Sequence, residues 1–246
     1  QQITEQKESS QLSIFDFKPQ GQDQESVSTL TGYYPVTYLS YSQLDTFNRC
    51  PLQYKYKYII SKNKPLSAAA SFGICLHNTL KDLYQQHQQK QNLTLKKVMK
   101  FLDQTWIKEG YSSKTHEKKM YQRAQEMLKT YWQKTYQKKD NPIALEQTFA
   151  LKITPSLKIG GRIDRVDRLP NGALEVIDYK TDKIPDQKQV DSSLQMTFYA
   201  MAASNPSLFN TNPEDIILSF YFLQNQEKIS THRTQQSLEQ AQKEII

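Results

Sequence analysis

The chain has 246 residues, of which 32 are basic and 25 acidic, so its formal net charge is +7. This length suits one sizeable domain or two small ones, and 15 tyrosines argue against a disordered chain, because disordered proteins are poor in aromatic residues. The basic balance favours a polyanionic partner, with nucleic acid as the first expectation and an anionic membrane surface as the second.

Cysteine content and hydropathy limit the cellular setting. Cys50 and Cys75 are too few for a disulfide framework or a four-thiolate cluster, and they favour a cytoplasmic location. The sequence has no apolar run of about 18 residues and does not open with a secretory signal. We therefore expect no membrane association. The first residue is Gln rather than Met, which favours a domain taken from a longer protein.

The N-terminal half predicts a polar tail followed by helices. Residues 1–35 are rich in Gln, Ser and acidic side chains, which is typical of a flexible linker or tail. A folded domain is expected over residues 36–246, and its first part, at about 38–140, is helical. The pattern predicts a first helix capped by Ser40 or Ser42, and further helices at about 72–87, 94–109 and 116–138.

The third and fourth of these helices have strongly basic outer faces. Such faces could track the phosphates of a nucleic acid or could simply be solvated, and the sequence favours neither reading. The basic residues concerned are Lys96, Lys97, Lys100, Lys118, Lys119, Arg123, Lys129, Lys134, Lys138 and Lys139.

After Pro142 the apolar period changes from helical spacing to two, which indicates strands. Three consecutive strands are predicted, the last two joined at Pro170-Asn171-Gly172, and they are followed by a helix, a strand, a short strand and a terminal helix. The expected ranges are 143–153, 156–169, 173–181, 187–203, 215–223, 227–233 and 235–245. This order predicts an α/β fold with a mixed sheet flanked by helices and a helical N-terminal part.

The segment "GRIDRVDRLPNGALEVIDYKT" places two carboxylates and a lysine close together. Because side chains alternate along a strand, Asp178 and Lys180 share a face, and Asp164 lies on the preceding strand. Converging carboxylates repel unless a cation lies between them, and oxygen ligands suit magnesium or manganese. A lysine beside such a metal can stabilise phosphate charge and orient a water. These parts would support hydrolysis of a phosphodiester.

An Asp and a Lys two residues apart on a strand are more often a solvated surface pair, so the neighbours matter. Val176 shares the face of Asp178, while Ile177 and Tyr179 occupy the other face. Both faces are therefore apolar near the acid, which predicts a buried central strand. Buried carboxylates are rarely left without a partner or a metal.

Five motifs in order, "YSQLDTFNRCPLQYKYKYI", "FGICLH", "GRIDRVD", "DYKT" and "QMTFYA", together resemble the PD-(D/E)xK nuclease superfamily. The branch that the chain resembles is the RecB-type nuclease domain of helicase-nucleases. The resemblance spans residues 38–225 approximately. It implies a restriction-endonuclease-like fold whose catalytic core is residues 143–246.

The resemblance also implies roles for individual residues. The implied ligands of Mg²⁺ or Mn²⁺ are His77, Asp164, Asp178 and the backbone carbonyl of Tyr179. The implied catalytic residues are Asp164, Asp178, Lys180, Gln195 and Tyr199. From the residues alone, His77 would be a hydrogen-bonded histidine on a buried helix. Glu146 corresponds to an acid often found on the first core strand, but a surface glutamate on an edge strand explains it equally well.

Some members of this branch hold an iron–sulfur cluster with four cysteines. This chain has Cys50 but not the three downstream cysteines, so we expect no iron–sulfur cluster and interpret Cys50 and Cys75 as structural. Tyr54, Tyr56 and Tyr58 could stack on single-stranded bases, although half-buried packing is the favoured reading.

The first hypothesis is a metal-dependent DNA nuclease domain that is the C-terminal part of a UvrD/RecB-like helicase. Exonuclease and endonuclease activity, on single or double strands, fit it equally. The second hypothesis is a catalytically silent DNA-binding scaffold of the same fold. The presence of Asp164, Asp178, Lys180 and His77 together favours the enzyme. An RNA-processing nuclease would use the same site.

One island interrupts the polar tail, "QLSIF" at residues 11–15. It resembles the short peptide by which many bacterial DNA enzymes dock on the replication sliding clamp, and its anchors would be Gln11, Leu12, Ile14 and Phe15. A tethering strand and a sticky linker are the competing interpretations.

Overall fold

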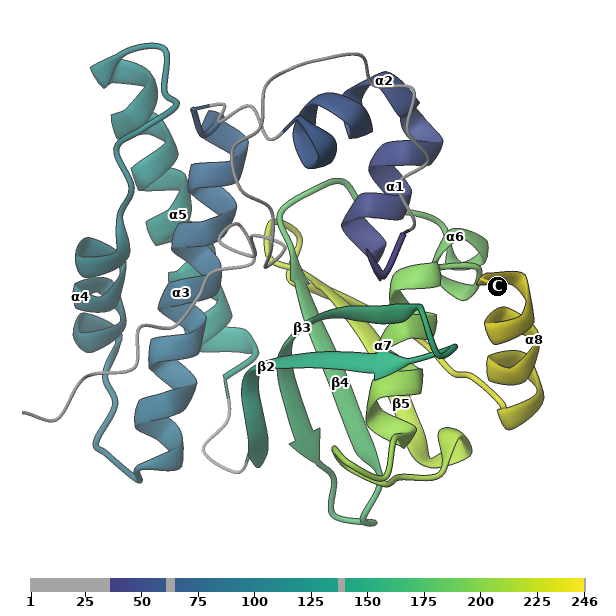
Figure 1. Cartoon of the computed structure of the whole chain (residues 1–246). Coiled ribbons are helices and arrows are strands. Elements are labelled where there is room, and N and C mark those ends of the chain that lie inside the picture. Colours follow the sequence, from purple (N-terminus) through teal and green to yellow (C-terminus); the bar gives the residue numbers. More distant parts are fainter. Residues whose placement is uncertain (1–35, 61–64, 137–139, 246) are drawn as a thin grey trace, which may run out of the picture. The chain divides into compact units, whose positions relative to one another are not determined.

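The computed structural model describes residues 36–60, 65–136 and 140–245. Within these residues, a mixed six-stranded sheet forms the centre of the unit Thr37–Ile246 (Figure 1). The predicted linker over residues 1–35 and its clamp-like peptide lie outside the described residues, as do Lys138 and Lys139. In the part of the chain that is described, no helix is both long and apolar enough to cross a membrane.

The sheet has the order β1-β3-β4-β5-β6, and β2 also pairs with β3. β2, β3 and β4 form the predicted antiparallel run, whereas β4 and β5 are parallel and β5 and β6 antiparallel. The strands are β1 (Tyr38–Ser40), β2 (Pro142–Lys152), β3 (Lys158–Arg168), β4 (Leu174–Lys180), β5 (Ile216–Phe222) and β6 (Glu227–Thr231). The predicted α/β fold with a mixed sheet flanked by helices is confirmed.

The helical elements are α1 (Tyr41–Arg49), α2 (Pro51–Tyr54), a π-helix η1 (Lys55–Ile59), α3 (Ala68–Gln88), α4 (Leu95–Thr105), α5 (Lys114–Lys134), α6 (Gln187–Asp191), α7 (Leu194–Ser204), a 3₁₀ turn η2 (Pro213–Asp215) and α8 (Gln235–Ile245). Of these, α1, α3, α4, α5 and α8 agree with expected ones, whereas α2, η1 and η2 were not expected. Ser40 caps α1, because its hydroxyl accepts the Gln43 amide and the Gln43 side chain accepts the Ser40 amide.

The prediction of one helix over residues 187–203 is wrong, because two helices lie there. α6 ends at Asp191, and the Ser193 side chain accepts a hydrogen bond from the amide of Met196 at the start of α7. Serine side chains satisfy the free amides of a helix start and so compete with helix continuation. The break matters because it sets the direction of α7, which carries Gln195 and Tyr199.

The sheet separates two apolar cores (Figure 1). α7 and α8 cover one face, where Met196 and Phe198 pack with Val176 and Leu218. α3, α4 and α5 cover the other face. Their contribution to the second core includes the buried Leu76, Leu80, Leu83, Leu102 and Leu128, packed against Ile177, Tyr179 and Tyr221. Both faces of β4 are therefore buried, as its apolar neighbours predict.

Gly160 allows the short strand β1 to join the sheet. A Cβ at this position would lie 2.6 Å from the ring of Tyr38 and 2.7 Å from the carbonyl oxygen of Phe149. The Tyr38 ring therefore crosses β3 at a place that only glycine leaves open. Because β1 leads directly into α1, this contact fixes the helix that borders the site described next.

Candidate active site

Asp178 and Lys180 lie side by side at the end of β4. The Lys180 Nζ atom is 2.7 Å from Asp178 Oδ2, and the carboxylate side chain is only 5% exposed. The alternation of side chains along β4 brings them to one face, as expected from the sequence. Burial lowers the pKa of Lys180, but the charge of Asp178 outweighs burial and raises that pKa above its ordinary value. Lys180 is thus an ammonium group held by a buried carboxylate.

α7 fixes both of these groups through Gln195. The Gln195 Nε2 atom donates to Asp178 Oδ1 at 2.8 Å, and its Oε1 atom accepts from Lys180 Nζ at 2.9 Å. The Tyr199 hydroxyl, one helical turn later, lies 2.8 Å from both Asp178 Oδ1 and the carbonyl oxygen of Arg162. Gln195 and Tyr199 therefore set the orientation of the acid and the lysine.

Asp164 faces this pair from β3 and meets a histidine from α3. Its Oδ2 atom accepts from the Tyr179 amide at 2.8 Å, and its Oδ1 atom lies 3.2 Å from His77 Nδ1. Burial opposes the ionisation of Asp164, but His77 and the Tyr179 amide outweigh it and lower the pKa of Asp164. Burial also disfavours protonated His77, yet Asp164 raises the pKa of His77 to about 9. A cation would compete with that proton.

Glu146 joins His77 and Asp164 in a group that could hold a metal ion. One ligand atom from each of the three lies within 4.8 Å of the others. The interpretation of Glu146 as a surface residue is wrong, because its side chain is only 10% exposed and lies 2.7 Å from Arg162 Nε. Burial, reinforced by Asp164, raises the pKa of Glu146.

The alternation of side chains along the strands is interrupted near Glu146, which explains why the sequence pattern does not predict that this residue is buried. Ile163 and Val166 belong to the same core, although strict alternation would put residues three apart on opposite faces. The interruption occurs at Asp164, opposite Glu146, whose φ is +51°. A non-glycine residue in this left-handed region is strained, and such strain is found preferentially at functional sites.

Unsatisfied polar atoms show that this group suits a divalent cation. Glu146 Oε2, Arg162 Nε and Asp178 Oδ2 are buried, and none has a hydrogen bond among the described residues, although each lies near an opposite charge. Buried oxygens are normally hydrogen-bonded. Buried carboxylate oxygens beside an imidazole are a suitable donor set for Mg²⁺ or Mn²⁺.

The structure thus brings together most of the residues expected from the sequence. His77 and Asp164 adjoin Glu146, while Asp178 stands outside that group of three and faces Lys180. Tyr179 contributes its amide to Asp164, and its phenol points to the opposite side of the sheet, where it lies 3.2 Å from the Tyr131 hydroxyl.

A hollow of about 560 Å³ opens beside Lys180. α1 forms one wall with Tyr41, Leu44, Asn48 and Arg49, and the start of α7 forms the other wall. A nucleotide-sized group could reach the lysine through it. Sequence patterns gave no sign of this hollow, because its walls come from elements that lie far apart in the chain.

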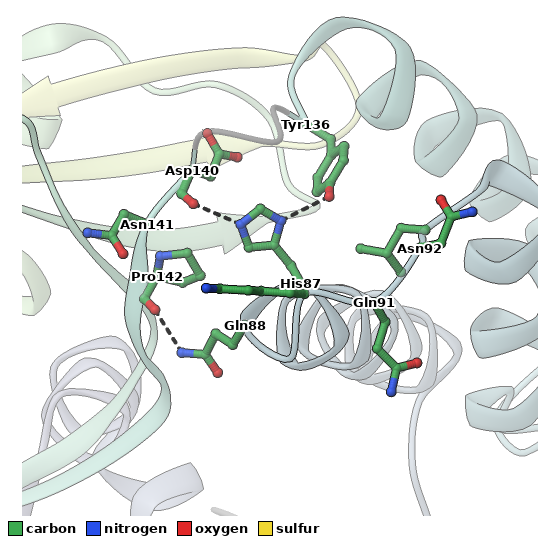
Figure 2. A pocket seen from close by; sticks show the side chains of 10 residues that line it. His87, Gln88, Gln91, Asn92, Tyr136, Asp140, Asn141 and Pro142 are labelled. Atoms are coloured by element: carbon green, nitrogen blue, oxygen red, sulfur yellow. Dashed lines mark hydrogen bonds between the residues drawn. The ribbon is translucent and has the colours of Figure 1, made fainter.

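A second hollow, of about 780 Å³, lies at the C-terminal end of α3 and contains none of the expected site residues (Figure 2). Its histidine, His87, is fully engaged: Nε2 is 2.8 Å from the Asp140 carbonyl oxygen and Nδ1 is 2.9 Å from the Tyr136 hydroxyl. Because a carbonyl only accepts, Nε2 carries the proton. We interpret this histidine as a structural one that ties α3 to the segment before β2.

Some basic residues of α4 and α5 take part in packing, and the others are exposed. Arg123 stacks over Phe72 and bonds Gln224, and Lys97 Nζ bonds Gln86 and Gln91, so both take part in packing. The remaining described lysines of the two faces are exposed: Lys96, Lys100, Lys118, Lys119, Lys129 and Lys134. Tyr54 and Tyr58 are half-buried, in line with packing, whereas Tyr56 is exposed.

Comparison with known proteins gives the family. The sequence profile described as "PD-(D/E)XK nuclease superfamily" matches residues 38–245. The chain is 32% identical over 109 residues to one of the subunits of the "ATP-dependent helicase/deoxyribonuclease" of Streptococcus mutans serotype c (strain ATCC 700610 / UA159), a match that covers 43% of this chain and 10% of that protein. A solved structure titled "Crystal structure of SSO0001" aligns over 81% of this chain and 86% of its own with 12% identity and a TM-score of 0.28.

The chain spans about a tenth of the length of the curated relative that it matches. The superfamily profile, in contrast, covers β1 to α8 and every residue of the site built above. The chain therefore belongs to the PD-(D/E)XK nuclease superfamily.

Proposed function

We propose that this domain is a metal-dependent DNA nuclease that hydrolyses phosphodiester bonds. The observation that carries the proposal is the buried Asp178–Lys180 pair, locked by Gln195, beside the group His77, Glu146 and Asp164, whose ligand atoms lie within 4.8 Å of one another. A purely structural cluster would leave fewer buried oxygens without hydrogen bonds.

His77, Glu146 and Asp164 would hold Mg²⁺ or Mn²⁺, with Asp178 and the Tyr179 carbonyl as the further ligands expected from the family resemblance. When bound, a divalent cation supplies charge that polarises the phosphate and lowers the pKa of a water. The Lys180 ammonium would neutralise charge that develops on the phosphate, and Gln195 holds it in place for that purpose.

In the proposed reaction the water oxygen forms a bond to phosphorus and the bond from phosphorus to the 3′ oxygen breaks. The 3′ oxygen leaves with a proton, so the products carry a 5′-phosphate and a 3′-hydroxyl. Asp178 would fix the position of Lys180 throughout, because Tyr199 and Gln195 both contact its Oδ1 atom.

DNA is the proposed substrate because the similar protein of Streptococcus mutans is named as part of a helicase/deoxyribonuclease. We further propose that the domain acts beside a helicase region of the same parent chain, in DNA repair or recombination in the cytoplasm. The net charge of +7 agrees with a polyanionic substrate.

The test is a cleavage assay on end-labelled single- and double-stranded DNA and on RNA, with EDTA, magnesium or manganese. Wild type is compared with Lys180→Ala and with Lys96→Ala, a matched exposed lysine on α4. Cleavage that needs metal and is lost only in Lys180→Ala supports the proposal. DNA binding without cleavage under every metal supports the scaffold instead, and preferential cleavage of RNA supports the RNA-processing alternative.

A further inference from the structure

The exposed apolar side chains of the described residues are concentrated in one place. Every large hydrophobic side chain that is exposed lies between Val36 and Ile60. Five of them lie in or directly after α1, α2 and η1: Phe47, Leu52, Tyr56, Ile59 and Ile60. α2 and η1 bury none of their residues, so this apolar surface is not the outer side of a core helix. We call the exposed part of residues 47–60 the N-terminal surface.

The geometry of the short helices gathers these side chains on one side. Leu52, Tyr56 and Ile60 follow one another at spacings of four residues, which places them on one helix face. Tyr54 and Tyr58 occupy the other side, where the Tyr54 ring meets Phe47 and Tyr58 at centroid distances of 5.5 and 5.3 Å. These half-buried tyrosines hold the turn in place and leave the Tyr56 ring outside.

The charge of this surface has one sign. Lys55 and Lys57 are exposed, and the sequence from Thr46 to Ile60 contains no acidic residue, whereas Arg49 is paired with Asp45 at the edge of the hollow. Lysine is depleted at protein–protein interfaces, whereas basic residues interleaved with exposed aromatic rings are typical of surfaces that bind unpaired nucleic acid. The alternation Lys55-Tyr56-Lys57 therefore favours a polyanion that carries flat apolar groups.

The N-terminal surface is continuous with the site. Asn48 and Arg49, at the end of α1, line the hollow of about 560 Å³ that also contains Lys180. A strand whose phosphate lies at Lys180 would meet Asn48 and Arg49, which belong to the N-terminal surface, within this hollow. A duplex could not stack on the Tyr56 ring, because its bases are already stacked and paired.

We propose that an unpaired DNA strand passes from Lys180 through this hollow and crosses the N-terminal surface, where a base stacks on Tyr56 and phosphates bind Lys55 and Lys57. This inference rests on the proposed nuclease function and adds the path and the unpaired state of its substrate. The aliphatic side chains around Tyr56 would contact sugars and base edges.

The experiment measures fluorescence anisotropy of a labelled oligothymidine and of a labelled blunt hairpin duplex in EDTA, which prevents cleavage. The test variants are Lys55→Gln with Lys57→Gln, Tyr56→Leu, and Tyr56→Phe, which keeps the ring. The matched control is Lys96→Gln with Lys100→Gln on α4, which removes the same charge from exposed lysines elsewhere. Thermal melting shows that each variant is folded.

The lysine pair should weaken binding of the single strand and lower the slope of log affinity against log salt by about 1.4, since each phosphate contact contributes about 0.7. Tyr56→Leu should weaken binding at least about fivefold with the slope unchanged, and Tyr56→Phe should bind as wild type does. Duplex binding and the control pair should not change.

The inference would be overturned if Lys55→Gln/Lys57→Gln and Tyr56→Leu bound the single strand as tightly as the wild type does. A protein would then be the partner of this surface. Equal weakening in the control pair would also overturn it, because binding would then follow total charge. The cleavage assay separates the two levels: metal-dependent cutting with unaffected variants removes only the strand path. A wild-type chain that neither binds nor cuts DNA removes both.

Discussion

The two faces of the sheet at β3 and β4 bury charge in opposite ways. On one face Arg165 is ion-paired with Asp167, lies 3.6 Å from the centre of the Tyr84 ring and donates to the Tyr131 and Tyr179 hydroxyls at 3.3 and 3.4 Å. On the other face Asp178 and Lys180 also pair, but Asp178 Oδ2 and the nearby Glu146 Oε2 have no hydrogen bond among the described residues.

The difference separates structure from function on two neighbouring strands. A buried guanidinium whose partners are all fixed locks β3, β4, α3 and α5 together, and it leaves nothing for a ligand to satisfy. Buried carboxylates that lie close together cost stability unless cations offset their repulsion. We therefore expect substitutions on the Arg165 face to change stability and substitutions on the Asp178 face to change activity.

The largest effect on stability should come from Arg165→Met. It leaves Asp167 buried without its partner, so the free energy of unfolding should fall by about 3–5 kcal/mol. Denaturant unfolding measures this. The double variant Arg165→Met/Asp167→Leu should recover part of the loss, because an apolar pair replaces a desolvated ionic one. A loss well below about 1 kcal/mol in the single variant would contradict the structural role of Arg165.

The next effect should come from Asp178→Asn on the opposite face. The amide keeps the shape but releases Lys180, so cleavage should fall about 100- to 1,000-fold, as when one electrostatic contact to a transition state is lost. The free energy of unfolding should fall less than in Arg165→Met, because the Lys180 side chain is 27% exposed and keeps its hydrogen bond to Gln195. Single-turnover cleavage and unfolding curves measure the two quantities. Loss of stability with full activity per folded molecule would reverse the assignment of the faces.

Glu146→Gln should weaken metal binding about 10- to 100-fold, since one charged donor of the group His77, Glu146 and Asp164 is lost. Titration with Mn²⁺, followed by electron paramagnetic resonance, measures the affinity. The matched control is Glu175→Gln, a buried glutamate on the Arg165 face that is held by Ser219 and Lys228. Equal affinity in wild type and Glu146→Gln would exclude Glu146 as a ligand.

These residues also show what the sequence could predict. The period of two on β4 predicts that Asp178 and Lys180 share a face. This prediction is confirmed, because nothing interrupts the alternation on that strand. The same rule does not predict the burial of Glu146. The alternation of side chains is interrupted at Glu146, where φ is positive, and sequence periodicity carries no information on such an interruption.

Contacts between elements that lie far apart in the chain are the other feature that the sequence could not predict. Tyr84, Tyr131 and Tyr179 meet at Arg165 from α3, α5 and β4, and the sequence pattern predicts none of these contacts. A pattern within one helix or strand does not say which hydroxyls from other elements will meet it. The order of helices and strands and the mixed sheet could be predicted, since they depend on local periodicity and on short connections.

The smallest effects sharpen the comparison most, because one atom is removed on each face. Tyr84→Phe deletes a hydroxyl that contacts Tyr131 at 2.7 Å and Asp140 at 3.1 Å, and it should lower the free energy of unfolding by about 0.5–1.5 kcal/mol with cleavage unchanged. Tyr199→Phe deletes a hydroxyl that contacts Asp178 and the Arg162 carbonyl, so a similar loss of stability should come with slower cleavage.

Each Tyr→Phe variant removes one hydroxyl that contacts a carboxylate, Asp140 on one face and Asp178 on the other, so the ratio of their cleavage rates compares the two faces. Unfolding curves and single-turnover rates, measured side by side, give that ratio. Equal cleavage by both variants would mean that Gln195 alone orients Asp178, because its Nε2 atom still donates to Asp178 Oδ1 when the Tyr199 hydroxyl is gone. The Tyr199 hydroxyl would then act on this face as the Tyr84 hydroxyl does on the other, through stability alone.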